Sequence, residues 1–488
     1  MRCTCAKFFR QRPAPQRQGI IFVAALGVIL VLTTVVLVLA QNMRTESLAS
    51  ANRVSYLQAD AVEQGAEKWV LANVESAGSV SLTVTQIPAN AMQLNSGYFW
   101  LISPDPDSDQ IQAYGMVDET RKLNINVATE QQLMALPNMT QDIADSIISW
   151  RGATSTSSST ASSGATDSYY QSLTEPYAMK NAPFESIEEL LLIKDIDQQL
   201  LYGYDINRDG VLSTAEQQAA GAASTVNSTT NGTRGIANDL TIYTTQAESR
   251  INVNGGTSTK LQNLLLKSVS SARANVILNN ITTATRAARG RPPFGTLADF
   301  YTASGMSADE FKALAGLITT NTATTVSGLI NPNTAGREVL GALFTGATGT
   351  SLTSSDADAV ISARANATNS SSGSSSSSVS SNSTTTNLGW VVDALGPTKA
   401  ATILNSFTTG SYQYSADIVA VSPDGRSFKR VRIVVDDRNS PAKIIYRKDL
   451  TSLGWPLPQD IRTALRSGQP IGTDQSNTNT LSNSVTGS

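Results

Sequence analysis

A run of 21 uncharged, mostly apolar residues stands near the start of the chain, over Ile20–Ala40. A helix of this length spans about 32 Å, which is enough to cross the hydrocarbon core of a bilayer. The residues before it carry five positive and no negative side chains, so we expect a single-pass anchor with a cytoplasmic N-terminus and an exported remainder. Apolar residues then recur every three or four positions over residues 54–72. The pattern predicts one helix over residues 20–75, membrane-embedded in its first half.

Strand-like segments occur in two regions that lie far apart in the chain. Residues 79–118 contain three such segments, and residues 412–438 form two more around a Ser-Pro-Asp-Gly turn. A further strand is expected over residues 443–450. The simplest arrangement pairs both regions in one antiparallel sheet that packs on the long helix. We therefore assign residues 76–120 and 411–460 to one sheet, and residues 461–488 to a disordered tail.

Between these regions, residues 121–410 are expected to form a large, mostly α-helical insertion. Similar segments that begin with Asn-x-Asn recur within it, which indicates two or three helix-hairpin-helix-like repeats. We interpret these asparagines as turn formers and helix caps. The fold class is therefore α+β, with a long N-terminal helix on an antiparallel sheet and a repeated helical insertion. The repeated segments are residues 123–133, 250–265 and 329–343.

Shorter sequence patterns predict individual helices and loops within the insertion. Residues 121–151 read as the end of a strand followed by two short helices, and residues 183–196 as another helix. A Ser186…Glu189 capping box favours the start of that helix. Stretches rich in Ser, Thr, Ala, Gly and Asn separate the helical units and are expected to be flexible surface loops. These stretches are residues 153–168, 219–235 and 366–387.

Composition excludes several classes of catalytic site. The chain has 488 residues, no histidine, and two cysteines, Cys3 and Cys5, both in the basic N-terminal segment. Ser-His-Asp and Cys-His triads and histidine-ligated metals are therefore excluded. A net charge of −3 provides no global basic field for nucleic acid. Since no motif places two carboxylates in a recognisable catalytic site, we expect no enzymatic activity.

The sharpest chemical motif is the segment D-I-N-R-D-G-V-L-S-T-A-E at residues 205–216. It matches the EF-hand calcium loop, which places oxygen ligands at positions 1, 3, 5, 7, 9 and 12 and glycine at position 6. Gly210 permits the sharp bend, and Leu212 is expected to anchor the loop to the core. A hard cation such as Ca²⁺ needs six to eight oxygens, which this spacing supplies. The expected ligands are Asp205, Asn207, Asp209, the carbonyl of Val211, Ser213 directly or through water, and Glu216.

The alternative interpretation of this segment is a polar turn that matches by chance, which residue usage makes rare in a chain of this length. Only a short helix can follow before the next low-complexity stretch. We therefore expect a single structural loop with a dissociation constant of about 10⁻⁴–10⁻³ M, as in extracellular modules, instead of a paired sensor. A second acidic group, Asp105, Asp107 and Asp109, lacks the glycine and closing glutamate, and is expected to be a solvated loop.

The junction between the basic segment and the apolar helix resembles a type IV prepilin signal, which implies cleavage between Gly19 and Ile20. Prepilin-like proteins usually carry glutamate at the fifth mature position, where this chain has Ala24. A carboxylate in the bilayer costs about 2.5–3.5 kcal/mol unless it is paired, and a subunit at a filament tip has no neighbour above it. Absence of this glutamate is characteristic of the type II secretion minor pseudopilin K family. Removal of a leader over residues 1–19 would leave 31 of the 36 basic residues against 39 acidic ones, a net charge of −8.

Longer stretches, from about Gln18 to Trp455, also resemble the minor pseudopilin K family. The most specific are VDETRKLNINVATEQQL, IADSIISWR, DSYYQSLTEPYAMKNAPFESIEELLLI and LTIYTTQAESRINVN. The resemblance implies an inner-membrane protein with a periplasmic C-terminal domain. It also implies a structural role, in which the protein caps the tip of the pseudopilus and helps to initiate its assembly and protein export across the outer membrane. The implied partners are minor pseudopilins I and J, the major pseudopilin, the inner-membrane assembly platform, and the prepilin peptidase, which also methylates the new N-terminus.

A membrane-anchored helix-hairpin-helix DNA-binding protein of a competence or type IV pilus system is the alternative function. Such hairpins use glycine-rich turns whose backbone amides reach the phosphate. Here the turn is Pro137-Asn138-Met139-Thr140, and the nearby Asp142 and Asp145 would repel phosphate. We therefore expect no nucleic-acid partner.

Overall fold

A computed structural model describes residues 18–77, 89–106, 112–152, 164–221, 234–255, 258–347, 352–370, 387–469 and 471. The chain divides into two compact units, residues 1–57 and residues 58–488. Helix α1, Gln18–Ala77, contributes its first part to one unit and its last part to the other. Its bounds agree with the helix predicted over residues 20–75.

The first unit contains the apolar part of α1. Its large apolar side chains, from Ile21 to Leu39, are exposed in the isolated chain. The helix is long and apolar enough to cross a membrane, although a signal sequence would pass the same test of length and composition. A single-pass anchor therefore fits this helix, and its orientation stays a prediction.

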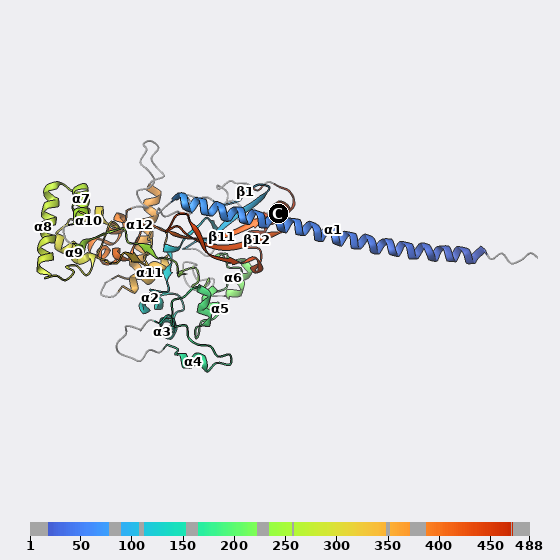
Figure 1. Ribbon diagram of the computed structural model, residues 1–488, viewed down its shortest axis with the longest axis horizontal. Helices are drawn as coiled ribbons and strands as arrows, with labels where there is room; N and C mark the ends of the chain where they lie inside the picture. Colours follow the sequence, from blue (N-terminus) through green and yellow to red (C-terminus); the bar gives the residue numbers. More distant parts are fainter. Residues whose placement is uncertain are drawn as a thin grey trace, which may run out of the picture. The chain divides into compact units, whose positions relative to one another are not determined.

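The second unit is built on a seven-stranded antiparallel sheet with the order β1-β2-β11-β12-β13, in which β3 pairs with β2 and β4 pairs with β11. Strands β1, β11 and β12 of this sheet are labelled in Figure 1. Strand β11 lies at the centre, because it pairs with β2 and β4 from before the insertion and with β12 from after it. Residues 78–88, which include the first predicted strand, lie outside the described part. The strands are β1 Met92–Leu94, β2 Gly97–Pro104, β3 Gln112–Tyr114, β4 Val117–Asp118, β11 Gln413–Val421, β12 Phe428–Asp436 and β13 Lys443–Asp449.

One face of the sheet packs against the last part of α1, which lies along it in Figure 1. Small and β-branched residues of α1 allow this close approach, and the Trp69 ring meets the Phe99 ring edge-on, with 5.5 Å between the ring centroids. The predicted packing of the long helix on an antiparallel sheet is therefore confirmed. The buried residues of this contact include Val62, Ala66, Val70 and Val74 of α1 and Phe99, Leu101, Ile418, Val431 and Ile433 of the sheet.

Charged side chains border this apolar contact. Glu63 of α1 is buried, and its carboxylate lies 2.9 Å from a guanidinium nitrogen of Arg447 and 3.3 Å from Nζ of Lys429. Burial raises the pKa of Glu63 to about 7, helped by the hydrogen bond and the negative charge of Glu67 and opposed by the two cations. The folded state therefore favours the protonated form of Glu63 more than the unfolded chain does.

Glu63→Gln is expected to reduce the pH dependence of stability. A carboxyl group with a raised pKa in the folded state stabilises the fold below its unfolded pKa, here 4.5, and loses that contribution as the pH rises through about 7. The loss amounts to a few kcal/mol at most, since each pKa unit corresponds to about 1.4 kcal/mol. The measurement is thermal unfolding of the full chain in detergent at about pH 5 and about pH 8. Equal pH dependence in wild type, Glu63→Gln and the exposed control Glu175→Gln would contradict this expectation.

The opposite face of the sheet is covered in part by the C-terminal segment. Trp100, Ile102 and Val419 form a second apolar cluster with Leu457 and Leu465. Leu465 belongs to α16, Gln459–Arg466, and is 3% exposed. The prediction of a disordered tail from residue 461 is thus wrong for residues 461–466, because this amphipathic turn buries its apolar side against the sheet. Residues 472–488 lie outside the described part.

The chain between β4 and β11 forms the insertion, whose helices and short strands enclose one continuous apolar core. The predicted α+β fold class is confirmed. The helices are α2 Glu130–Met134, α3 Gln141–Trp150, α4 Asp167–Gln171, α5 Gln198–Tyr202, α6 Thr214–Ala220, α7 Thr259–Ser268, α8 Ser271–Ala287, α9 Leu297–Ser304, α10 Ala308–Leu314, α11 Arg337–Thr345, α12 Ser354–Ser370, α14 Gly389–Leu395 and α15 Pro397–Ile403. The strands are β5 Leu123–Asn124, β6 Leu240–Thr241, β7 Gln246–Ala247, β8 Ile251–Asn252, β9 Ile318–Thr319 and β10 Thr325–Val326.

Two local predictions for the insertion need correction. The helix predicted over residues 183–196 is only a 3₁₀ turn at Ile187–Leu192, since the backbone at Ile193 is extended and Asp195 has a positive φ. The expected capping contact does form, because the Glu189 carboxylate accepts the N–H of Ser186 at 3.2 Å. Most of the low-complexity stretches lie outside the described residues, but their described ends are ordered: Ala165 is buried, residues 167–168 begin α4, residues 219–220 end α6, and residues 366–370 end α12.

The same pair of hydrogen bonds closes two of the Asn-x-Asn segments. The side-chain amide of Asn126 accepts the N–H of Phe184 at 2.7 Å and donates to its carbonyl at 3.1 Å. Asn254 makes the equivalent bonds to Phe294, at 3.0 and 2.9 Å. Both segments also start a short parallel strand pair, β5 with β6 and β8 with β9. These asparagines therefore connect distant segments of the chain. The turns that the sequence indicated come from the first asparagine of each segment, since Asn124 accepts the N–H of Asn126 at 2.9 Å and Asn252 accepts that of Asn254 at 2.7 Å. The comparison with helix-hairpin-helix units stays a prediction.

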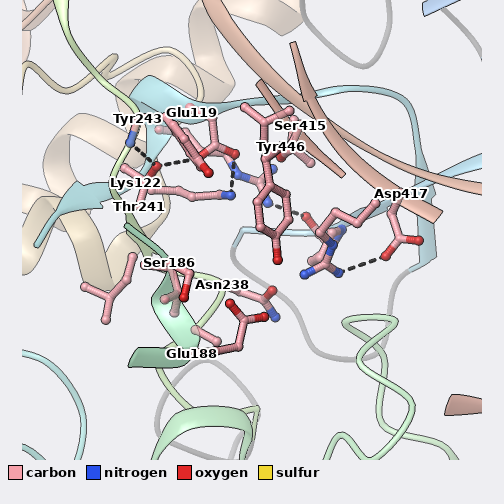
Figure 2. Close-up of a pocket in the computed structure, with 18 of the residues that line it drawn as sticks. Glu119, Lys122, Ser186, Glu188, Asn238, Thr241, Tyr243, Ser415, Asp417 and Tyr446 are labelled. Carbon is pink, nitrogen blue, oxygen red and sulfur yellow. Dashed lines mark hydrogen bonds and ion pairs between the residues drawn. The ribbon is translucent and has the colours of Figure 1, made fainter. Parts of the chain in front are cut away.

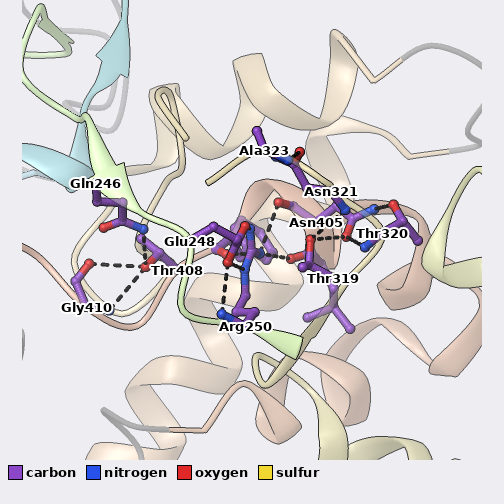
Figure 3. Close-up of polar contacts among 12 residues, drawn as sticks. Gln246, Glu248, Arg250, Thr319, Thr320, Asn321, Ala323, Asn405, Thr408 and Gly410 are labelled. Atoms are coloured by element: carbon purple, nitrogen blue, oxygen red, sulfur yellow. Dashed lines mark hydrogen bonds and ion pairs between the residues drawn. The ribbon is translucent and has the colours of Figure 1, made fainter. Parts of the chain in front are cut away.

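Arg250 joins the second of these segments to the end of the insertion (Figure 3). Its guanidinium donates to the carbonyls of Phe407 at 2.9 Å and Asn405 at 3.1 Å, and pairs with Glu248 at 2.7 Å. Beside it, the Gln246 amide donates to the Thr408 hydroxyl at 3.0 Å. This network connects the insertion to the chain that enters β11, and so fixes where the insertion rejoins the sheet.

Candidate functional site

The EF-hand-like segment lies between α5 and α6, within the described part of the chain. Two of its residues have positive φ, Arg208 at 56° and Gly210 at 84°. A Cβ on Gly210 would lie 2.4 Å from Cβ of Pro104 at the end of β2. Glycine is therefore required both by the turn and by the close approach of the sheet. The bend expected at the sixth loop position is present.

The two aspartates of the loop turn their carboxylates toward its interior amides. Asp205 accepts the N–H of Asp209 at 3.1 Å through Oδ1, and that of Gly210 at 2.8 Å through Oδ2. Asp209 accepts the N–H of Val211 at 2.8 Å and the side-chain amide of Asn207 at 2.9 Å. These bonds close the first half of the loop around the oxygens at positions 1, 3 and 5.

Glu216 closes the other half. Its Oε1 accepts the N–H of Ile206 at 2.9 Å, and its Oε2 accepts the N–H of Ser213 at 2.8 Å. The Ser213 hydroxyl caps α6 by accepting the N–H of Glu216 at 3.4 Å. The Glu216 carboxylate therefore contacts the backbone of Ile206, ten residues earlier and near the start of the loop. Leu212 is buried, as expected of an anchor at the eighth position.

The electrostatics of the loop favour a cation. Burial raises the pKa of Asp205 to about 6; two backbone N–H bonds and Arg430 oppose the rise, and the negative charge of Glu216 adds to it. Burial and the charge of Asp205 raise the pKa of Asp209 to about 7. Bringing these carboxylates together in their ionised form therefore costs free energy that a divalent cation would offset.

The donor set fits calcium chemically, since it consists of oxygen atoms only. The loop would offer the carboxylates of Asp205, Asp209 and Glu216, the amide oxygen of Asn207, the carbonyl of Val211 and the hydroxyl of Ser213. Within the described ranges, however, no three acidic side chains already converge as a metal-binding group. In this structure the carboxylates of Asp205 and Glu216 accept hydrogen bonds from backbone N–H groups, so these side chains would have to turn toward the ion when calcium binds.

A cavity with several charged residues in its lining lies between the sheet and the insertion (Figure 2). Glu119 accepts a hydrogen bond from Thr241 and contacts Lys122 at 2.6 Å. Burial opposes ionisation of Glu119, but the charge of Lys122 and these hydrogen bonds keep its pKa below the usual range. On the far side, Glu188 pairs with Lys448 of β13. These contacts form a polar interface between the sheet and the insertion.

Sequence reasoning missed two residues next to the loop, Asp417 of β11 and Arg430 of β12. Both are buried on the face of the sheet opposite α1, and they form a bidentate ion pair at 2.8 and 2.9 Å. The available signal was an aspartate, Asp417, between the apolar residues Ala416 and Ile418 of a buried strand. Because a fully buried charge requires partners, such a position predicts a polar network.

The remaining predicted site residues have different outcomes. Gly19 and Ile20 lie in the first turn of α1, and their cleavage stays a prediction. Asp105 accepts a hydrogen bond from Arg234 through its carbonyl, while Asp107 and Asp109 lie outside the described residues. In the hairpin between α2 and α3, Thr140 caps α3, whose first turn carries Asp142. An acidic residue at this helix start disfavours a phosphate contact.

Comparisons with known proteins bear on the part of the chain that precedes the loop. Residues 111–203 match the family model of protein K of the type II secretion system. A search of curated proteins gives no match. Among solved structures, the chain is similar to one from the GspK–GspI–GspJ complex of the type 2 secretion system of enterotoxigenic Escherichia coli. That likeness has 11% identity and a TM-score of 0.37, and covers 83% of this chain and 99% of the other. The resemblance to protein K that the sequence indicated is confirmed over residues 111–203.

Proposed function

We propose that this chain, whose residues 111–203 match the protein K family, is a minor pseudopilin that caps the pseudopilus tip of a type II secretion system. The family match carries the proposal. It covers the end of the sheet region and the start of the insertion, from β3 to the turn after α5. The apolar helix α1 and its packing on an antiparallel sheet support a pilin-like subunit.

Two features support a position at the tip. Ala24 lacks a carboxylate that could pair with the N-terminus of a subunit above. The insertion between β4 and β11 is also far larger than the sheet that carries it, so a further subunit would have difficulty stacking above it. The protein would help to initiate pseudopilus assembly and protein export, anchored in the inner membrane with its second unit in the periplasm. Its partners would be minor pseudopilins I and J, the major pseudopilin, the prepilin peptidase and the assembly platform.

Co-purification tests this role. The full chain, tagged at its C-terminus, is produced with minor pseudopilins I and J from the same genome and extracted in detergent. We expect the three proteins to elute together in equal amounts. Recovery of the tagged chain alone, under conditions in which I and J still bind each other, would contradict the proposal.

Calcium would serve this function as a structural ion in the loop at residues 205–216. When bound, the ion supplies positive charge that offsets the repulsion between Asp205, Asp209 and Glu216. The protein residues would orient the oxygens and bury the site against Pro104 of the sheet. The periplasm is in contact with extracellular calcium, so a weak site would suit this location.

A further inference from the structure

Arg430 connects the loop to the centre of the sheet. Its side chain is fully buried on β12, and its Nε and Nη2 donate to the Asp417 carboxylate at 2.9 and 2.8 Å. The same guanidinium also donates to the carbonyl of Arg208 at 2.7 Å and to that of Asn207. These two carbonyls belong to the third and fourth positions of the loop, between the aspartates that would bind calcium.

The guanidinium of Arg430 binds a carboxylate and two main-chain carbonyls at the same time. The planar guanidinium of arginine presents five N–H groups in a fixed fork, so one side chain can pair with a carboxylate on one edge and with main-chain carbonyls on another. Asp417, which belongs to the neighbouring strand β11, fixes the orientation of that fork. The position of the loop backbone is thereby tied to two central strands of the sheet.

Two further contacts hold the next part of the loop. Arg234 donates to the carbonyl of Gly210 at 3.2 Å and to that of Asp105, just after β2, at 2.8 Å. Pro104 packs so closely on Gly210 that no side chain could be added there. The first half of the loop is therefore held by groups of β2, β12 and the segment before β6, all outside the loop itself.

We propose that Arg430 is a positioning residue of the calcium loop, which holds the carbonyls of Asn207 and Arg208 in the ion-binding conformation before calcium arrives. Through Asp417, calcium binding is then coupled to the sheet. The coupling to calcium rests on the proposed ion site, whereas the attachment of the loop to the sheet does not.

The charge and the position of Arg430 have opposite effects on calcium. As a cation close to Asp205 and Asp209, it repels a second cation, so charge alone predicts that its removal tightens calcium binding. If its role is to position the loop, removal weakens binding, because the free loop must lose conformational freedom when the ion binds. The sign of the change in affinity therefore separates the two roles.

The test measures calcium affinity by isothermal titration of the full chain in detergent, for wild type and three variants. Arg430→Lys keeps the charge but cannot reach two carbonyls and a carboxylate at once, and Arg430→Met removes the charge as well. Arg432→Met is the matched control, because Arg432 shares Asp417 at 2.8 Å but approaches the Arg208 carbonyl only at 3.4 Å. We expect both Arg430 variants to bind calcium about tenfold more weakly, as for other residues that orient metal ligands, and Arg432→Met to change little.

Hydrogen exchange without calcium completes the test. In the presence of a chelator, the amides of Asp209, Gly210 and Val211 should exchange faster in Arg430→Lys than in wild type, while those of β12 stay protected. Unchanged exchange in the loop, or calcium affinity equal to or tighter than wild type in both Arg430 variants, would overturn the inference. Failure of the wild type to bind calcium would overturn the ion site, and the exchange result would still decide whether Arg430 holds the loop.

Discussion

Calcium is expected to raise the melting temperature of the full chain by several degrees, and Glu216→Gln to abolish this rise. At calcium about 100-fold above its dissociation constant, binding to the folded state alone contributes about 2.7 kcal/mol. Glu216 would supply two oxygens to the ion, and in the structure its carboxylate already returns to the start of the loop at Ile206. The amide of glutamine keeps the shape but loses the charge and one acceptor. The measurement is thermal unfolding in detergent with calcium and with a chelator.

Glu175→Gln serves as the control for this experiment, since Glu175 is exposed and lies outside the loop. Its melting temperature should rise with calcium as that of the wild type does. Equal shifts in Glu216→Gln and wild type would place calcium elsewhere, and no shift in any variant would contradict the site.

Asn126→Ala is expected to destabilise the insertion by about 2–3 kcal/mol. The substitution leaves both backbone polar groups of Phe184 without their partner, and Phe184 itself is buried. A buried polar group that loses its partner costs about 1–3 kcal/mol. Asn254→Ala should have a similar effect, because Asn254 makes the same two bonds to Phe294. Chemical denaturation of the full chain in detergent measures the change.

The control for the asparagines is Asn279→Ala, an exposed position within α8. Alanine has the higher helix propensity, so this variant should be as stable as wild type or slightly more stable. A loss of stability in Asn126→Ala no larger than in Asn279→Ala would show that the two hydrogen bonds of Asn126 to Phe184 contribute nothing to stability.

The features that the sequence predicted best are those set by local patterns. The spacing of Asp205, Gly210 and Glu216 defines a loop within one short segment, and the structure bends that segment at Gly210 as expected. In the same way, the apolar run at the start of α1 predicted the helix, and the Ser-Pro-Asp-Gly turn predicted the hairpin of β11 and β12.

The missed features depend on contacts between distant segments. The Arg430–Asn207 contact joins residues more than 200 positions apart, and no local rule relates them. The helix predicted at residues 183–196 shortened to one 3₁₀ turn, because Asp195 takes a positive φ. The tail predicted from residue 461 became helix α16, since Leu465 finds an apolar site on the sheet. For α16, tertiary packing therefore outweighed local propensity.

Mass spectrometry of the N-terminus of the membrane-bound protein tests the central claim most directly. A pilin-like subunit must be cut between Gly19 and Ile20 before α1 can enter a filament. We therefore expect a mature chain that begins with N-methylated Ile20. A chain that begins at Met1, or one cut near Gln41 after the apolar run, would contradict the assignment.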